Sequence, residues 1–211
     1  MISVVRISAF IAAFSLAGIL FAILSLISGW PVGIPGTCTL LAWAYLSQAR
    51  WKRLERATGK EPGLSERRLW VELAGYSAVT AHLAAALWLA GADLRLGSGN
   101  WLAVDSWTLT GAAFGISLAF RNTRHPRDER DTAIANGGFR ASYGSLLITL
   151  VIFAILLASQ DPFRSASDPS FQIGNVLIGL GLLSHLVGLA IRLGYYAEDA
   201  RHQCLEPDFD D

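Results

Sequence analysis

Apolar residues occur along the chain in long blocks, and most charged residues gather in the shorter segments between them. The first block, residues 7–27, contains no charged residue. At about 1.5 Å rise per residue, a helix of this length crosses the roughly 30 Å hydrocarbon layer of a bilayer. Five similar blocks follow it. The pattern therefore predicts six transmembrane helices, at about residues 7–27, 31–48, 70–89, 101–120, 143–159 and 173–193.

The second and fourth blocks are the weakest of these predictions. The second opens with the segment "GIPG" at residues 33–36, which we expect to kink or break the helix because proline and glycine disfavour a helix interior. The first block exceeds the core of a cleaved signal peptide, so we expect the mature protein to keep it. Residues 1–200 then form one transmembrane domain, and we expect the acidic tail, residues 201–211, to be disordered.

Composition agrees with lipid as the main solvent. Of the 211 residues 53% are hydrophobic and 16% are charged, against about 25% charged in soluble domains. The formal net charge is zero, which gives no sign of a nucleic-acid partner. Two cysteines, Cys38 and Cys204, are too few for a disulfide framework. We therefore predict an all-α, multi-pass helix bundle in the inner (plasma) membrane.

Basic residues predict the orientation of this bundle. Fifteen of the 17 Lys and Arg residues fall on one predicted side, mostly in the connections 49–69 and 121–142, whereas the opposite loops hold only Arg95 and Arg164. Cytoplasmic loops retain Lys and Arg. We therefore expect both termini to lie in the cytoplasm.

Small residues recur at a spacing of four on three predicted helices, as is typical of helices that pack closely in lipid. We expect such rows to pack within one chain, and homo-oligomerisation is the alternative. The rows are Ala9, Ala13 and Ala17; Gly111 and Gly115; and Ser184 and Gly188.

The stretch "HPRDERDTAIANGGFRASYG", residues 125–144, combines many charges with an abrupt change to apolar residues. Pro126 suits the first turn of a helix, and acidic residues in that turn are favourable at the positive end of the helix dipole. We expect a short interfacial helix, a flexible joint at Gly137 and Gly138, and a transmembrane helix from about Ala141. Carboxylates in such a solvated first turn favour a structural or partner-facing role over catalysis, which needs desolvated groups.

The segment "PRDERDTAIANGGFRASYG", followed by an apolar helix, resembles the signature of a family of small, uncharacterised prokaryotic integral membrane proteins. That signature is an Asp-Glu-Arg-Asp-type motif, then Ile, Arg and an aromatic residue before a membrane span. The later "GLAIRLGYY" at residues 188–196 adds to the resemblance, which covers the last third of the chain. It implies a few spans and no established activity, and the pair Gly137-Gly138 departs from the pattern. The matching residues are Asp128, Glu129, Arg130, Asp131, Ile134, Arg140 and Tyr143.

Four ionisable residues fall within or at the ends of the predicted spans, where an unpaired charge is costly. We expect Glu72 and Asp105 to reach interfacial or solvated surroundings. His82 and His185 lie near the predicted midplane, where they could bond to Ser77, Thr80 or Ser184 as packing residues, shuttle protons, or ligate haem iron as a pair.

These observations favour a protein without catalytic chemistry of its own, one that binds a partner or lipid as a regulator, sensor or accessory subunit. The first alternative is a small transporter or channel with a polar path along His82, His185 and Asp105. The second is a paired-histidine haem protein. We expect no metal and no other cofactor, since the sequence has no C-x-x-C-H attachment and no metal-spaced cluster. The catalytic Walker, G-x-S-x-G and H-E-x-x-H motifs are also missing. The expected partners are membrane lipids and another membrane or cytoplasmic protein.

Overall fold

The computed structural model describes residues 4–58, 64–89, 94, 101–121, 129–160 and 169–205. These residues form six α-helices, so the predicted all-helical fold is confirmed. Four of the six, α1, α4, α5 and α6, are long and apolar enough to cross a membrane. The helices are α1 (Val4–Ser28), α2 (Gly33–Thr58), α3 (Leu64–Leu89), α4 (Trp101–Arg121), α5 (Glu129–Gln160) and α6 (Pro169–Leu205).

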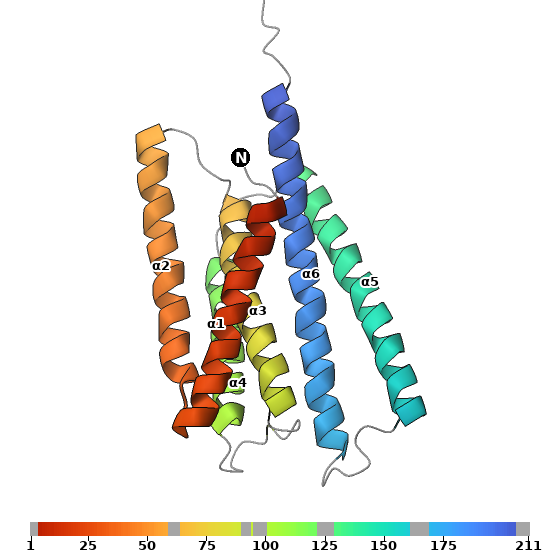
Figure 1. Cartoon of the computed structure of the whole chain (residues 1–211). Helices are drawn as coiled ribbons and strands as arrows, with labels where there is room; N and C mark the ends of the chain where they lie inside the picture. Colours follow the sequence, from red (N-terminus) through yellow and green to blue (C-terminus); the bar gives the residue numbers. More distant parts are fainter. Residues whose placement is uncertain are drawn as a thin grey trace, which may run out of the picture.

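The helices run alternately up and down the bundle (Figure 1). Helices α1, α3 and α5 begin at the same end at which α2, α4 and α6 finish. Most of the described Lys and Arg residues lie toward this end, which we call the basic end. Helix α2 continues to Thr58 and α6 to Leu205, so both extend well beyond the apolar blocks that predicted them.

Helix α3 lies at the centre of the bundle and packs against α1, α4 and α6 (Figure 1). Almost every residue from Leu69 to Val79 is buried. The two helices that are less apolar than a membrane span are α2 and α3, whereas the sequence pattern marked the second and fourth as weakest. For α3 the reason is that a helix enclosed by its neighbours does not need an apolar surface on every side. For α2 the reason is the run of charged residues in its last turns.

The turn between α1 and α2 differs from the expected helix break. Gly29 has a φ of 62° and ends α1 in the left-handed conformation that glycine adopts without a Cβ clash. Pro35 lies in the first turn of α2, where its missing N–H breaks no helical bond. Helix α2 is continuous from Gly33, so the "GIPG" segment starts this helix and does not break it.

The flexible joint expected at Gly137 and Gly138 is also wrong, because α5 is one continuous helix through both residues. Their role is close packing on α6. A Cβ at Gly137 would lie 2.7 Å from the ring of Tyr195, and a Cβ at Gly138 would overlap the side chain of Arg192. The two glycines therefore let the helices approach each other.

The small-residue rows have different roles. Gly188 contacts Ser142 and the backbone of Gly138, and Ser184 donates a hydrogen bond to the carbonyl oxygen of Ser142, so this row packs α6 on α5 as predicted. The row at Gly111 and Gly115 is exposed, with open space around both glycines. Ala9 and Ala13 of the α1 row are exposed as well. For these two rows, packing within the bundle was the wrong interpretation.

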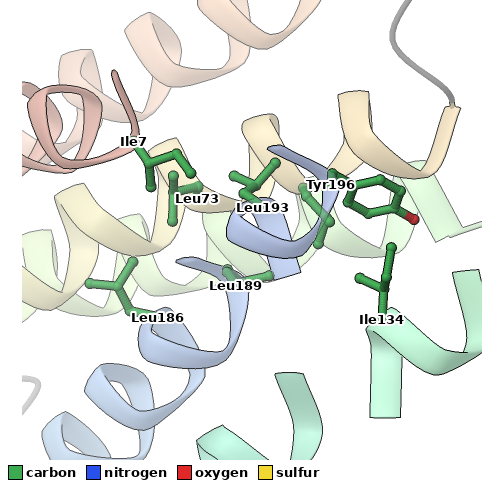
Figure 2. Close-up of a cluster of buried hydrophobic side chains, with 8 residues drawn as sticks. Ile7, Leu73, Ile134, Leu186, Leu189, Leu193 and Tyr196 are labelled. Atoms are coloured by element: carbon green, nitrogen blue, oxygen red, sulfur yellow. The ribbon is translucent and has the colours of Figure 1, made fainter. Parts of the chain in front are cut away.

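Near the basic end, side chains from four helices form an apolar cluster (Figure 2). Ile7 comes from α1 and Leu73 from α3, while Ile134 is the contribution of α5. Helix α6 supplies the remaining labelled members, Leu186, Leu189, Leu193 and Tyr196. This cluster underlies the polar groups described next.

Candidate functional site

A polar cluster joins α3, α5 and α6 at the basic end, and Asp131 is its centre. The hydroxyl group of Ser65 on α3 donates to Asp131 Oδ2 at 2.6 Å. The phenol of Tyr196 on α6 donates to the other carboxylate oxygen, Oδ1. One carboxylate therefore links three helices, and its two bonds to hydroxyl groups are of the stronger, charge-assisted kind.

Arg130, the preceding residue, makes a second connection between α5 and α6. Its guanidinium group pairs with the carboxylate of Asp199, and its Cζ lies 5.5 Å from the centre of the Tyr196 ring. The cation–π contact joins the two segments that carried the sequence resemblance, because Tyr196 belongs to residues 188–196, and the ion pair reaches Asp199, three residues beyond it. Segments more than sixty positions apart in the sequence thus meet at one place.

The other members of the predicted interface motif do not join this cluster. Glu129 begins α5 and is exposed. Arg140 is also exposed on α5. Asp128 lies outside the described residues. The motif therefore divides into side chains that hold helices together, Arg130 and Asp131, and side chains that face the surroundings.

The first turns of α3 bring further charges to the basic end. Trp70 Nε1–H donates to Glu66 Oε1 at 3.3 Å. Burial raises the pKa of Glu66 above its ordinary value, and the Trp70 bond and the charge of Arg130 oppose that rise. The carboxyl group thus ionises less readily than a solvated one.

Glu72 does not reach the interface that the sequence predicted for it. Its side chain is 5% exposed and accepts a bond from Arg68 Nε at 2.7 Å. These residues are one helical turn apart, so α3 neutralises its own buried carboxylate. The physical reason for the difference is the central position of α3, because the neighbouring helices enclose the turn that carries Glu72.

His185 on α6 packs against α3 next to that carboxylate. Its ring meets the ring of Tyr76 edge-on, with the centres 4.4 Å apart. The charges of Glu72 and Arg192 both act on its imidazole. Ser184, one of the expected partners of the histidines, instead bonds to α5 through Ser145 and the carbonyl of Ser142.

His82 on α3 is fully buried and has a different neighbour. Its Nδ1 lies 3.2 Å from the carbonyl oxygen of Gly18 on α1, to which the N–H donates. Its partner is therefore a backbone carbonyl group and not Ser77 or Thr80. His82 is thus directed at α1, whereas the ring of His185 contacts Tyr76.

Asp105 on α4 is fully buried, so the solvated surroundings expected for it are wrong. Its carboxylate faces the hydroxyl group of Ser25 and the backbone N–H groups of Val32 and Gly33, although no hydrogen bond of standard geometry reaches either oxygen within the described residues. A Cβ at Gly33 would lie 2.7 Å from Asp105 Oδ1. The carboxylate thus lies at the N-terminus of α2, where the helix dipole favours a negative charge.

A groove separates the outer faces of α5 and α6 beside the polar cluster. Its volume is about 390 Å³. Ala133, Ile134 and Gly137 line it from α5, and Tyr195 lines it from α6. The charges at its edge are those of Arg130, Glu198 and Asp199. Among the described residues, no three His, Cys, Asp or Glu side chains are placed to hold a metal ion.

The fold and these contacts define the class: an all-helical protein, four of whose described helices are apolar enough to cross a membrane. No family model, curated protein or solved structure matches the chain. Sequence reasoning singled out Arg130 and Asp131 but missed Ser65 and Asp199 as their partners, since neither residue belongs to a motif.

Proposed function

We propose that the chain is a six-span protein of a prokaryotic inner membrane, with both termini in the cytoplasm and no catalytic chemistry of its own. It binds anionic lipid headgroups or an acidic partner protein through its basic end. The resemblance to the small membrane-protein family of the Asp-Glu-Arg-Asp-type motif is part of this proposal, because that family shares a charged motif placed just before a span.

Helices α2 and α3 supply the two spans beyond the four apolar ones. Each has 26 residues, enough for about 39 Å of helix. Helix α3 is enclosed by α1, α4 and α6, so its polar side chains avoid lipid. Both helices run lengthwise beside the apolar ones (Figure 1). Alternating direction through six spans returns the chain to its starting side.

The observation that carries the binding proposal is the contrast between paired and exposed charges at the basic end. Arg68 and Asp131 have partners inside the bundle, which assigns them a structural role. The last turns of α2 carry cations that are exposed to the surroundings, namely Arg50, Lys52, Arg53 and Arg56. Each Lys or Arg near an anionic leaflet contributes about 1 kcal/mol of attraction.

The test is to replace those four residues of α2 with glutamine in the full chain and to count retained phosphatidylglycerol molecules by native mass spectrometry. We expect the tightest lipid to lose about tenfold in occupancy, which corresponds to about 1.4 kcal/mol. The matched control replaces Arg95 and Arg164, the two basic residues of the opposite connections, and should change nothing. Equal loss in both variants, or a reporter fused after Asp211 that is exported, contradicts the proposal.

The transporter alternative would require internal water. His82, His185 and Asp105 each have a different neighbour, so they do not form one path by direct contact. Buried polar atoms without a protein partner in the described residues include Thr80 Oγ1 and His82 Nε2, and such atoms are often satisfied by water. Proton flux into liposomes that is lost when both histidines become leucine would favour this alternative.

A further inference from the structure

The groove between α5 and α6 combines three charges that remain accessible to a ligand. Arg130 and Asp199 pair with each other, yet their side chains are 44% and 39% exposed. Glu198, one residue before Asp199, is exposed as well. A guanidinium group has five N–H donors, so the pair with Asp199 leaves donors for a second acceptor. The groove therefore presents one cation and two carboxylates side by side.

This arrangement is complementary to a zwitterion with a phosphate and an ammonium group. A phosphate is recognised by the planar, multiply donating guanidinium group of an arginine. A primary ammonium group has three donors and is satisfied by carboxylates. A purely anionic headgroup would meet the two carboxylates at close range, where like charges repel. The charge pattern thus selects against the lipids that the rest of the basic end attracts.

The face of α5 that enters the groove continues as an apolar surface toward the opposite end. From Gly137, positions seven, eleven and eighteen residues further on lie on the same side of the helix. These positions are Gly144, which has open space around it, and Ile148 and Ile155, which are 63% and 61% exposed. A ligand seated in the groove can therefore extend an acyl chain along α5, which argues for a lipid and against a soluble phosphoamine.

We propose that the groove binds one phospholipid with a phosphoethanolamine headgroup. Arg130 receives the phosphate, Glu198 with Asp199 receives the ammonium group, and an acyl chain follows Gly144 and Ile148 down α5. The inference rests on the proposed function, because that function places the basic end at a membrane surface. It adds a single site of defined headgroup chemistry to a surface that otherwise attracts anionic lipid.

The experiment measures which lipid the full chain retains in detergent from an equimolar mixture of phosphatidylethanolamine and phosphatidylglycerol with the same acyl chains. Native mass spectrometry reports the ratio. We expect about a threefold preference for phosphatidylethanolamine at the first site, as befits partly exposed ion pairs. Glu198→Gln should bring the ratio near one, because it removes an ammonium partner and leaves the contacts between α5 and α6 unchanged. Arg130→Gln should reduce retention of both lipids.

Glu129→Gln is the matched control, because Glu129 is an exposed carboxylate at the start of α5 that does not line the groove. It should keep the wild-type ratio. A wild-type ratio of one, a Glu198→Gln ratio equal to that of the wild type, or full displacement of the lipid by soluble glycerophosphoethanolamine overturns the site. The α2 variant tests the proposed function separately, because its count of phosphatidylglycerol depends on a different helix.

Discussion

Helices α3 and α5 are both long, yet they occupy opposite kinds of position in the bundle (Figure 1). Helix α3 is enclosed by α1, α4 and α6, and about half of its residues are buried. Helix α5 packs mainly along α6, and no residue of its most apolar stretch is buried. The less apolar helix is therefore the better buried one. Hydropathy along the chain reports what surrounds each helix, and it does not rank the helices by burial.

The two helices also use their polar residues differently. Glu72 and His82 are buried side chains of α3. The partner of Glu72 is Arg68, one turn away on the same helix, and the partner of His82 is the carbonyl group of Gly18 on α1. Helix α5 places its polar contacts at its first turns, where Asp131 bonds to α3 and α6. We therefore expect mutations on the α3 side to affect the whole fold and mutations on the α5 side to release one helix.

The largest effect should follow from Gly18→Ala, which breaks the contact between α1 and α3. A Cβ at Gly18 would overlap the backbone carbonyl group of Ala78, which cannot rotate away as a side chain can. We expect a loss of about 3 kcal/mol in the free energy of unfolding, the upper range for overpacking. Thermal unfolding in detergent measures this loss. Gly111→Ala, at a glycine with open space around it, is the control and should unfold at or slightly above the wild-type temperature, because alanine favours a helix more than glycine does.

A smaller and more local effect should follow from Gly188→Ala on α6. The new Cβ would meet the Ser142 hydroxyl group and lie 2.8 Å from the backbone oxygen of Gly138, so α5 must move outward. We expect a loss of about 2 kcal/mol. Hydrogen exchange should rise in α5 while protection of α3 stays unchanged.

Gly144→Ala provides the comparison on α5 itself, because nothing lies within 4 Å of the added Cβ. Its exchange pattern should match the wild type. If Gly188→Ala instead raised hydrogen exchange equally in α3 and α5, the two helices would unfold as one unit. The proposed difference between them would then be wrong.

The smallest of the three effects concerns the link between the two helices. Asp131→Ala removes the acceptor of Ser65 and Tyr196 and should cost about 1 to 2 kcal/mol in the free energy of unfolding. Glu129→Ala, two residues earlier in the same motif, should change stability by less than about 0.5 kcal/mol because Glu129 is exposed. Denaturant unfolding of both variants is the measurement. Equal losses in the free energy of unfolding would contradict a structural role for Asp131.

The predicted helices agree closely with the observed ones where apolar blocks are long. The first block, 7–27, lies within α1, and the block 101–120 nearly coincides with α4. Helix ends in charged segments were harder to predict. Arg50 to Arg56 continue α2, because charged residues with good helix propensity extend a helix after the apolar block ends.

The candidate site was only partly predictable. Arg130 and Asp131 were expected at the basic end, but as side chains facing solvent or a partner. Their partners on α3 and α6 lie more than sixty positions away, and no local pattern indicates such contacts. Glu72 and Asp105 were expected near solvent because depth was judged from position along a helix, whereas burial depends on which helices surround that position.

By itself, the sequence determined the class of fold, the approximate place of each helix and the gathering of basic residues at one end. These properties follow from the composition of contiguous segments, because helix formation and hydrophobicity act locally along the chain. Only the tertiary structure decided that α3 is central, that Gly137 and Gly138 are packing positions in a continuous helix, and that Asp131 joins three helices. Those properties depend on how side chains from distant segments fit together in space, and no segment carries that information alone.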